Sequence, residues 1–226
     1  MVFDVISKHR IIAKQFPGKA GGLPVADYGK YAIVAILDSV EGFSDAALWK
    51  TPDDCAAMRR LALGRCRGFW SRGIRRLLER ELTEDGVRLR SEKTRLIHGD
   101  LHHGNFLFKD GCVSGFFDFE NVTQGYPAED LIRYFVCASE HLRWYEQHRK
   151  LRILDLFRIA VARLPYPADE WATALNRLLV LKIARKAADR GLGFLMSVNL
   201  LFRARYYRTL KRVAAETRAK LGADLV

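Results

Sequence analysis

Long apolar stretches are missing from this sequence of 226 residues. The longest uninterrupted apolar run, 31–37, is far shorter than the roughly 20 residues that a membrane-spanning helix needs. The first residues show no basic start followed by an apolar segment and a small-residue cleavage site, so the sequence predicts no export signal. Cysteine is scarce and scattered, without C-x-x-C spacing, which predicts reduced, mostly buried thiols in a cytoplasmic protein.

Acidic residues are fewer than basic ones, 26 against 38, which gives a formal net charge of +12. A charge of this size favours anionic partners through long-range attraction but does not determine the fold. Nucleic acid, a phosphorylated sugar and an anionic membrane surface would each fit. The length suits one domain, or one domain with a small additional lobe, and a hydrophobic content of 49% is typical of globular proteins.

One stretch, 95–135, has a residue order that indicates chemistry. Two short apolar runs, 106–108 and 113–117, flank a segment that contains Asp110-Gly111. Asp-Gly between apolar runs predicts a β-hairpin, because both central positions of its tight turn need a positive φ.

Three oxygen-bearing side chains lie at the outer ends of this predicted hairpin. Asp100 and Asn105 precede it and Asp118 follows it. Because a hairpin brings its outer ends together, we expect these three side chains to converge. Phosphoryl transfer needs such a set: one carboxylate for the proton of the attacking hydroxyl, and an amide oxygen and a second carboxylate to hold Mg²⁺.

Three motifs in this stretch occur together in a known family. Residues 98–105, HGDLHHGN, have the H-x-D-x-x-x-x-N spacing of the kinase catalytic loop; DFE at 118–120 stands where kinases have D-F-G; and GYPAEDL at 125–131 has the form G-x-P-x-x-D-L. Together they resemble the aminoglycoside phosphotransferase and choline kinase-like branch of the protein-kinase-like superfamily, including its kinases of lipopolysaccharide-core sugars. Protein kinases usually carry Arg before the loop Asp.

The resemblance implies roles around the phosphates. Asp100 would be the catalytic base, and His98 would either assist it or bond to backbone near the loop. Asn105 and Asp118 would bind Mg²⁺. Glu120 would be a further metal carboxylate or would bond to a metal-bound water.

It also implies a nucleotide side and a supporting residue. Asp38 and Val40 fall in the segment that resembles the hinge, where the adenine bonds to backbone. His103 would touch the phosphates or line the loop, and Lys14 would be the phosphate lysine. Asp130 would accept hydrogen bonds from the catalytic-loop backbone; otherwise it is a first-turn acid facing the helix dipole.

The first 22 residues allow two interpretations. If residues 11–14 form a strand, Lys14 is placed as the family requires. The spacing of the apolar residues favours a helix instead, which would leave Lys14 as a solvated surface residue. The residues that give this spacing are Val2, Val5, Ile6, Ile12 and Phe16.

The remaining chain reads as helical. A helix with Thr51 as N-cap is predicted to run to about Leu82, although its glycines weaken it. Further helices are predicted from Pro127 and over 151–164, 170–186 and 195–220. The expected fold is α+β and protein-kinase-like, with a reduced N-lobe and hinge over 1–42 and a mostly helical C-lobe with the catalytic hairpin over 43–226.

The expected function is transfer of the γ-phosphate of ATP, with Mg²⁺, to a hydroxyl of a small molecule, sugar or glycolipid. The charge favours an anionic acceptor over a choline-like amino alcohol or an aminoglycoside, and peripheral contact with the inner face of the membrane. Two alternatives are a degenerate kinase-like binding module without catalysis and a basic, helical nucleic-acid-binding protein. A zinc hydrolase built on His98, Asp100, His102 and His103 would leave Asn105 and the DFE motif unexplained.

Overall fold

The structure is a computed structural model that describes residues 2–7, 10–14, 19–20, 54–89, 94–102, 105–109, 112–116, 118, 121–140, 147–164, 166–189 and 192–223. The chain divides into two compact units. The first comprises Met1–Pro52 and Ser91–Leu164, and the second Asp53–Arg90 and Pro165–Val226. Across the described residues, the search for a helix able to cross a membrane finds none. The division into an N-lobe over 1–42 and a C-lobe over 43–226 stays a prediction.

The N-terminal segment forms a hairpin, so the helix favoured by its apolar spacing is wrong. Strand β1 (Val2–Ser7) pairs antiparallel with β2 (Arg10–Lys14), with Val2 opposite Lys14. The apolar residues are mostly Val and Ile, whose branched side chains fit a pleated strand better than a helix. The strand of the alternative interpretation is therefore confirmed and Lys14 ends it, while the role of Lys14 at the phosphates stays a prediction.

The predicted β-hairpin is present in the first unit. Strand β5 (Phe106–Lys109) pairs antiparallel with β6 (Cys112–Phe116), and β3 (Lys19–Ala20) adds to the other edge of β5. Phe106 lies opposite Phe116. The Asp110-Gly111 turn falls outside the described residues.

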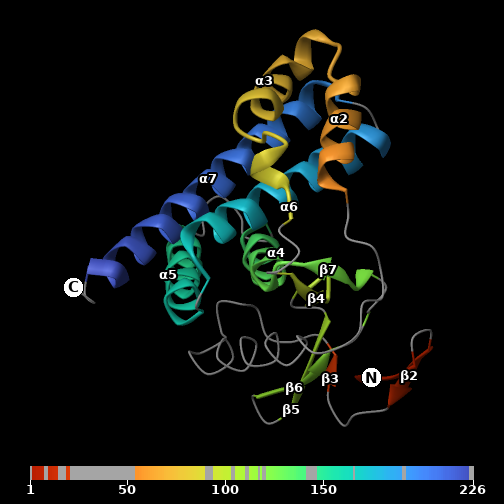
Figure 1. Cartoon of the computed structure of the whole chain (residues 1–226), viewed down its shortest axis with the longest axis vertical. Coiled ribbons are helices and arrows are strands. Elements are labelled where there is room, and N and C mark those ends of the chain that lie inside the picture. The colour runs from red at the N-terminus through yellow and green to blue at the C-terminus, as the bar shows by residue number, and fades with distance from the viewer. Residues whose placement is uncertain are drawn as a thin grey trace. The chain divides into compact units, whose positions relative to one another are not determined.

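A second small sheet and two helices complete the described part of this unit (Figure 1). Strand β4 (Arg95–Ile97) pairs antiparallel with β7 (Thr123–Gly125), and α4 (Pro127–Glu140) contacts β4. Helix α5 (Gln147–Arg163) packs on α4. Buried rings form this contact: Phe135 meets Tyr134 and Phe157 edge to face at 5.5 and 5.4 Å between centroids.

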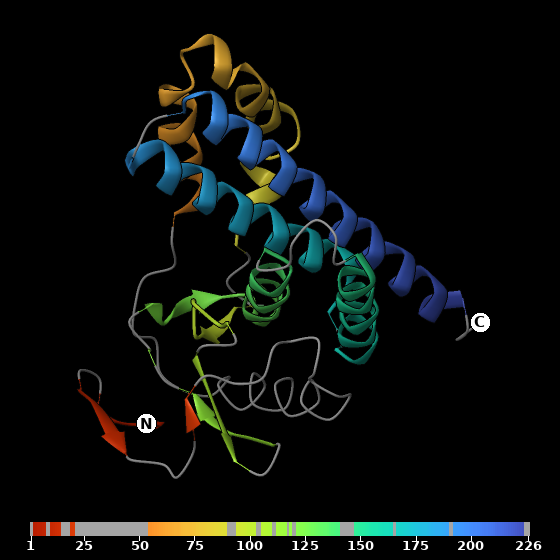
Figure 2. The same cartoon turned by 180° about the vertical axis from the view of Figure 1, so that it is seen from behind.

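The described residues of the second unit are helical, as predicted for the C-terminal half. Its short elements are α2 (Cys55–Arg65), α3 (Arg72–Arg80) and the 3₁₀ turns η3 (Phe69–Ser71) and η4 (Asp85–Val87). Its two long helices, α6 (Ala168–Asp189) and α7 (Phe194–Ala223), run side by side in both views (Figures 1 and 2).

The core of the second unit forms along α6, which contacts α2, η4 and α7. Fully buried residues of this helix include Trp171, Leu175, Val180 and Ile183.

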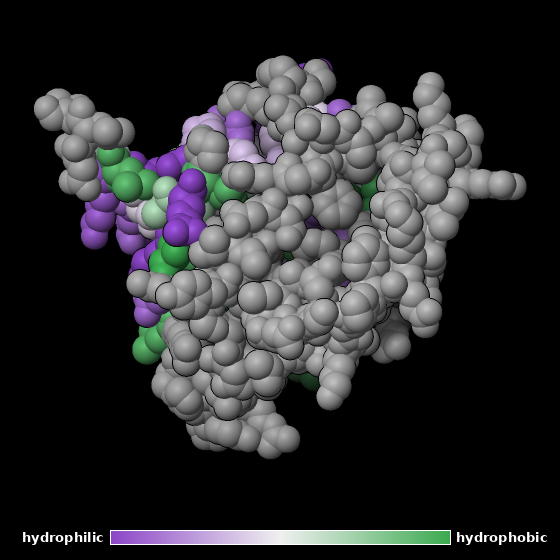
Figure 3. Space-filling model, turned by 90° about the horizontal axis from the view of Figure 1, so that it is seen from below, coloured by the Kyte–Doolittle hydropathy of each residue, from purple (hydrophilic) through white to green (hydrophobic). Residues whose placement is uncertain are grey.

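The surface has a mixed character. In the view from below, the coloured part at the left carries hydrophilic and hydrophobic residues side by side (Figure 3). Such mixing is normal, because polar groups never cover a whole protein surface.

The single helix expected over 51–82 is wrong in its continuity. Helix α2 ends at Arg65, Gly68 adopts an extended backbone, and α3 begins at Arg72. The N-cap is Asp54, whose Oδ1 accepts a hydrogen bond from Ala57 N at 2.9 Å; Thr51 lies outside the described residues. Gly64 and Gly68 lie at this break, and glycine lowers the helix propensity of the segment, so the helix is interrupted between Arg65 and Arg72.

The cysteine prediction is confirmed for three residues. Cys55, Cys66 and Cys137 are reduced, and the first two are buried. Burial raises the pKa of the Cys66 thiol to about 11, which disfavours its reactive thiolate.

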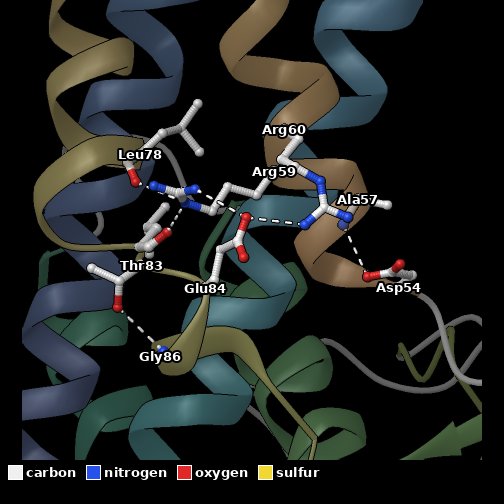
Figure 4. A network of polar contacts seen from close by, with 9 residues as sticks. Asp54, Ala57, Arg59, Arg60, Leu78, Thr83, Glu84 and Gly86 are labelled. Atoms are coloured by element: carbon white, nitrogen blue, oxygen red, sulfur yellow. Dashed lines mark hydrogen bonds and ion pairs between the residues drawn. The ribbon is translucent and has the colours of Figure 1, made fainter.

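Arg59 of α2 holds the end of α3 in place (Figure 4). Its guanidinium donates hydrogen bonds to the carbonyl oxygens of Leu78, at 3.0 Å, and of Leu82. These carbonyls belong to the helix end, where no intrahelical donor remains. Arg59 Nη1 also forms an ion pair with Glu84 Oε1 at 3.8 Å, and the exposed neighbour Arg60 bonds to the same oxygen at 3.0 Å.

We predict that Arg59→Met lowers the free energy of unfolding of the chain by about 1–3 kcal/mol, because two part-buried carbonyls lose their donor. Arg60→Met is the matched control, since it removes only an exposed ion pair worth less than about 1 kcal/mol. Urea titrations of both variants provide the measurement. Equal effects of the two substitutions would contradict this role of Arg59.

Candidate active site

The loop at residues 98–105 connects two paired strands of the first unit. It leaves β4 at Ile97, which lies opposite Thr123 of β7, and it enters β5 at Phe106, which lies opposite Phe116 of β6. Both ends of the loop are therefore fixed by strand pairing.

The Asp130 carboxylate fixes the first part of the loop. Asp130 lies in the first turn of α4 and is buried. Its Oδ2 accepts a hydrogen bond from His98 N at 2.6 Å, and its Oδ1 accepts one from Gly99 N at 2.9 Å. Both oxygens thus bond to consecutive backbone N–H groups, and a short stretch of loop is held at two points.

Opposing effects act on the protonation of this carboxyl. Burial raises the pKa of Asp130, because the charged form loses its hydration. The His98 side chain, the two backbone N–H donors and Arg133 act in the opposite direction. The carboxylate is therefore tied electrostatically to the loop that it supports.

Gly99 allows the loop to pack closely on the chain that follows the hairpin. Its φ is +77°, and a Cβ at this position would lie 2.0 Å from the backbone oxygen of Asn121. Such a distance is far inside van der Waals contact, so glycine is required both for the backbone angle and for the space.

Asn105 closes the other end of the loop. This buried residue donates from its Nδ2 to Asp100 O at 2.9 Å, and its backbone N donates to His102 O at 2.9 Å. With the amide nitrogen bonded to backbone, the amide oxygen is directed away from this contact and can be offered to a cation. Asp100 itself is half-buried.

Asp118 is exposed and has a φ of 65°, an uncommon angle for a residue with a side chain. Strained backbone of this kind is frequent at functional sites. Asn105 precedes Phe106 and Asp118 follows Phe116 by two residues, so the strand register brings the two backbone positions to the same end of the hairpin.

Four of the residues expected at the site, Asp38, Val40, His103 and Glu120, lie outside the described residues. Lys14 is placed at the end of β2, and its side chain is likewise outside the description. His98 is buried beneath the loop, with its backbone N bonded to Asp130.

The sequence analysis missed Glu129. It is buried, and its Oε1 accepts a hydrogen bond from Tyr126 N, the residue before α4, at 3.3 Å. The signal was present in the sequence: Pro127 at the first helical position and Glu129 at the third are half of a capping box. The contact of Asn121 with Gly99 has no comparable sequence signal.

The donor set fits Mg²⁺ better than zinc. The amide oxygen of Asn105 and the carboxylate of Asp118, at the same end of the hairpin, are hard oxygen donors of the kind that Mg²⁺ prefers. Among the described residues, which include His98, Asp100 and His102, no group of three or more His, Cys, Asp or Glu could hold a metal ion.

We predict that Gly99→Ala destabilises the chain. The positive φ alone costs about 1–3 kcal/mol, and the contact with Asn121 O adds to it. Gly64→Ala is the matched control: Gly64 lies within α2 with no atom in reach of an added Cβ, so helix propensity should raise the stability by up to about 1 kcal/mol. Urea unfolding measures both, and a neutral Gly99→Ala would contradict the described loop.

A family model, the phosphotransferase enzyme family (APH), matches residues 37–152, which are 116 of the 226 residues. The match spans 98–105, 118–120 and Asp130. None of the curated proteins matches the chain significantly.

Solved structures show the fold. A choline/ethanolamine kinase family protein from Mesorhizobium loti superposes with a TM-score of 0.53 at 12% identity, covering 92% of this chain and 74% of that protein. Amicoumacin kinase hAmiN, in complex with AMP-PNP and Ca²⁺, superposes with a TM-score of 0.49 at 14% identity, covering 88% of this chain and 63% of that protein. Aminoglycoside phosphotransferase APH(3'')-Id from Streptomyces rimosus superposes with a TM-score of 0.46 at 21% identity, covering 70% of this chain and 66% of that protein.

The chain thus spans less than two thirds of the length of these last two enzymes. The family match and the fold of the Mesorhizobium loti protein agree with the α+β, mostly helical architecture. The chain belongs to the phosphotransferase enzyme family and has its protein-kinase-like fold.

Proposed function

We propose that this protein transfers the γ-phosphate of ATP to a hydroxyl group of a small molecule, sugar or glycolipid. One observation carries the proposal: a loop with the family's catalytic spacing is held by Asp130 at its start and by the Asn105–Asp100 bond at its end. Preorganised polar groups of this kind are what phosphoryl transfer requires, because catalysis rests on positioning and charge stabilisation.

Asp100 is proposed as the catalytic base. The acceptor oxygen would form a bond to the γ-phosphorus while the bond from that phosphorus to the β–γ bridging oxygen breaks, and the hydroxyl proton would pass to the Asp100 carboxylate. The bond from Asn105 to the backbone oxygen of Asp100 supports this position of the carboxylate. His98, buried under the loop, would keep the backbone in place.

Asn105 and Asp118 are proposed to hold Mg²⁺, with Glu120 as a further metal carboxylate or a hydrogen-bond partner of a metal-bound water. When bound, the ion would neutralise charge on the phosphate oxygens. The shared end of the hairpin and the bond that orients the Asn105 amide support this assignment. Lys14, Asp38, Val40 and His103 are proposed to contact the nucleotide.

The acceptor is proposed to be anionic, as in a phosphorylated sugar or a lipopolysaccharide-core glycolipid. The net charge of +12 supports this, because a polycationic acceptor would be repelled. Among similar proteins, APH(3'')-Id has been solved with ADP and streptomycin, and hAmiN with AMP-PNP, Ca²⁺ and Ami. A cytoplasmic protein in peripheral contact with the inner membrane face would meet a glycolipid acceptor.

We predict that the chain, given Mg²⁺ and ATP, releases ADP when a suitable hydroxyl acceptor is present, and that Asp100→Asn lowers kcat by about 10²–10⁴-fold. Nucleotide affinity should change little, since Asp100 is proposed to act on the acceptor. The measurement is ADP release across a panel of sugars, glycolipids, choline and aminoglycosides, with calorimetry of nucleotide binding alongside.

Asp155→Asn is the matched control, because Asp155 is an exposed carboxylate of α5 in the same unit, paired with Arg158. It should keep the wild-type rate. Nucleotide binding without turnover of any acceptor would favour the degenerate binding module, and an active Asp100→Asn would remove Asp100 from the mechanism.

A further inference from the structure

Large apolar side chains are exposed in the second unit on η3 and on the first half of α7, two elements that contact each other. We call this set the aromatic patch. Its members and their exposed fractions are Phe69 65%, Trp70 54%, Phe194 52%, Leu195 80% and Phe202 68%. Exposed apolar clusters of this kind mark sites of interaction with a partner or a membrane, because a soluble protein gains nothing by keeping them in water.

The aromatic patch is held in a defined arrangement. Trp70 meets Phe69 edge to face at 5.0 Å between centroids, and it meets Phe194 at 4.8 Å. The elements beneath are packed closely: a Cβ added at Gly73 of α3 would lie 3.0 Å from Leu201 Cδ1 of α7. The fold of the unit therefore brings the rings of η3 into contact with the Phe194 ring of α7.

Basic residues flank the aromatic patch in the sequence, and one of them, Arg72, contacts it. The Arg72 guanidinium lies over the Phe69 ring, 4.9 Å from its centroid. Residues 64–80 carry one acid, Glu79, which is paired with Arg75 at 2.8 Å, and 192–205 carry none. The arginines of these two segments are Arg65, Arg67, Arg72, Arg75, Arg76, Arg80, Arg203 and Arg205.

Exposed aromatic side chains with arginines beside them fit a lipid bilayer better than other partners. Trp and Phe favour the membrane interface, and arginines beside them attract anionic headgroups. A single-stranded nucleic acid would need open ring faces for stacking, whereas here the rings meet edge to face and Arg72 covers a face of Phe69.

We propose that the aromatic patch docks the second unit on the surface of a bilayer that contains anionic phospholipids. The apolar side chains enter the headgroup boundary, and the surrounding arginines contact lipid phosphates. The proposal does not rest on phosphotransfer, since it concerns only the second unit, and it stands if the chain binds nucleotide without turnover.

The test is flotation of the full chain with vesicles of phosphatidylcholine alone, or of phosphatidylcholine with about one third of the anionic lipid phosphatidylglycerol. We predict binding to the anionic vesicles that weakens with salt. Vesicle binding should weaken at least about tenfold in the triple variant with Trp70→Ser, Phe194→Ser and Leu195→Ser. In the double variant with Arg72→Gln and Arg76→Gln, it should weaken about fivefold per arginine at low salt. Leu151→Ser, at a residue 62% exposed on α5, is the matched control and should bind as the wild type does.

A second measurement is independent of the variants' folding. Lipids brominated near the headgroup should quench part of the tryptophan fluorescence of the wild-type chain, and Trp70→Phe should lose that part. Absence of binding to anionic vesicles, binding that the triple substitution leaves unchanged, or quenching unaltered in Trp70→Phe would each overturn the proposal. Self-association through the aromatic patch, seen by sedimentation and lost in the triple variant while vesicles are ignored, would assign the surface to a second copy instead.

Discussion

Two hydrogen bonds to one buried carboxylate are the constraint on which the candidate site depends. Asp130 accepts the N–H groups of His98 and Gly99, and it is supplied by the first turn of α4, where the helix dipole favours negative charge. The loop cannot shift without leaving a buried carboxylate unsatisfied, which is costly. The position of α4 therefore determines the position of the loop.

The remaining contacts extend this constraint to the polar side chains. The contact of Gly99 with Asn121 ties the loop to the segment after the hairpin, and the amide of Asn105 ties its end to Asp100. Asp118 is joined through the register of β5 and β6. Backbone positions separated in the sequence are thus held together without a ligand, and catalysis by positioning depends on such preorganisation.

Sequence patterns predicted the features that local chemistry decides. Asp110-Gly111 between apolar runs located the hairpin, and Pro127 located the start of α4. The segment 1–22 was ambiguous, because its branched apolar residues satisfy a helical spacing while strand pairing, a non-local contact, selects the hairpin. The break after Arg65 falls between Gly64 and Gly68, glycines that already weaken the helix predicted there. The positive φ of Gly99 and its contact with Asn121 were not predictable, since neither leaves a pattern in sequence.

The most direct test of the account is calorimetry of Mg²⁺-dependent AMP-PNP binding to the wild type and to folded Asp130→Asn. An asparagine presents an amide N–H group where a carboxylate oxygen accepts one, so one loop donor loses its acceptor. The account predicts metal-dependent binding to the wild type and about ten- to hundredfold weaker binding to the variant, as expected for a lost charge-assisted hydrogen bond. Equal affinities, or no binding to the wild type, would contradict it.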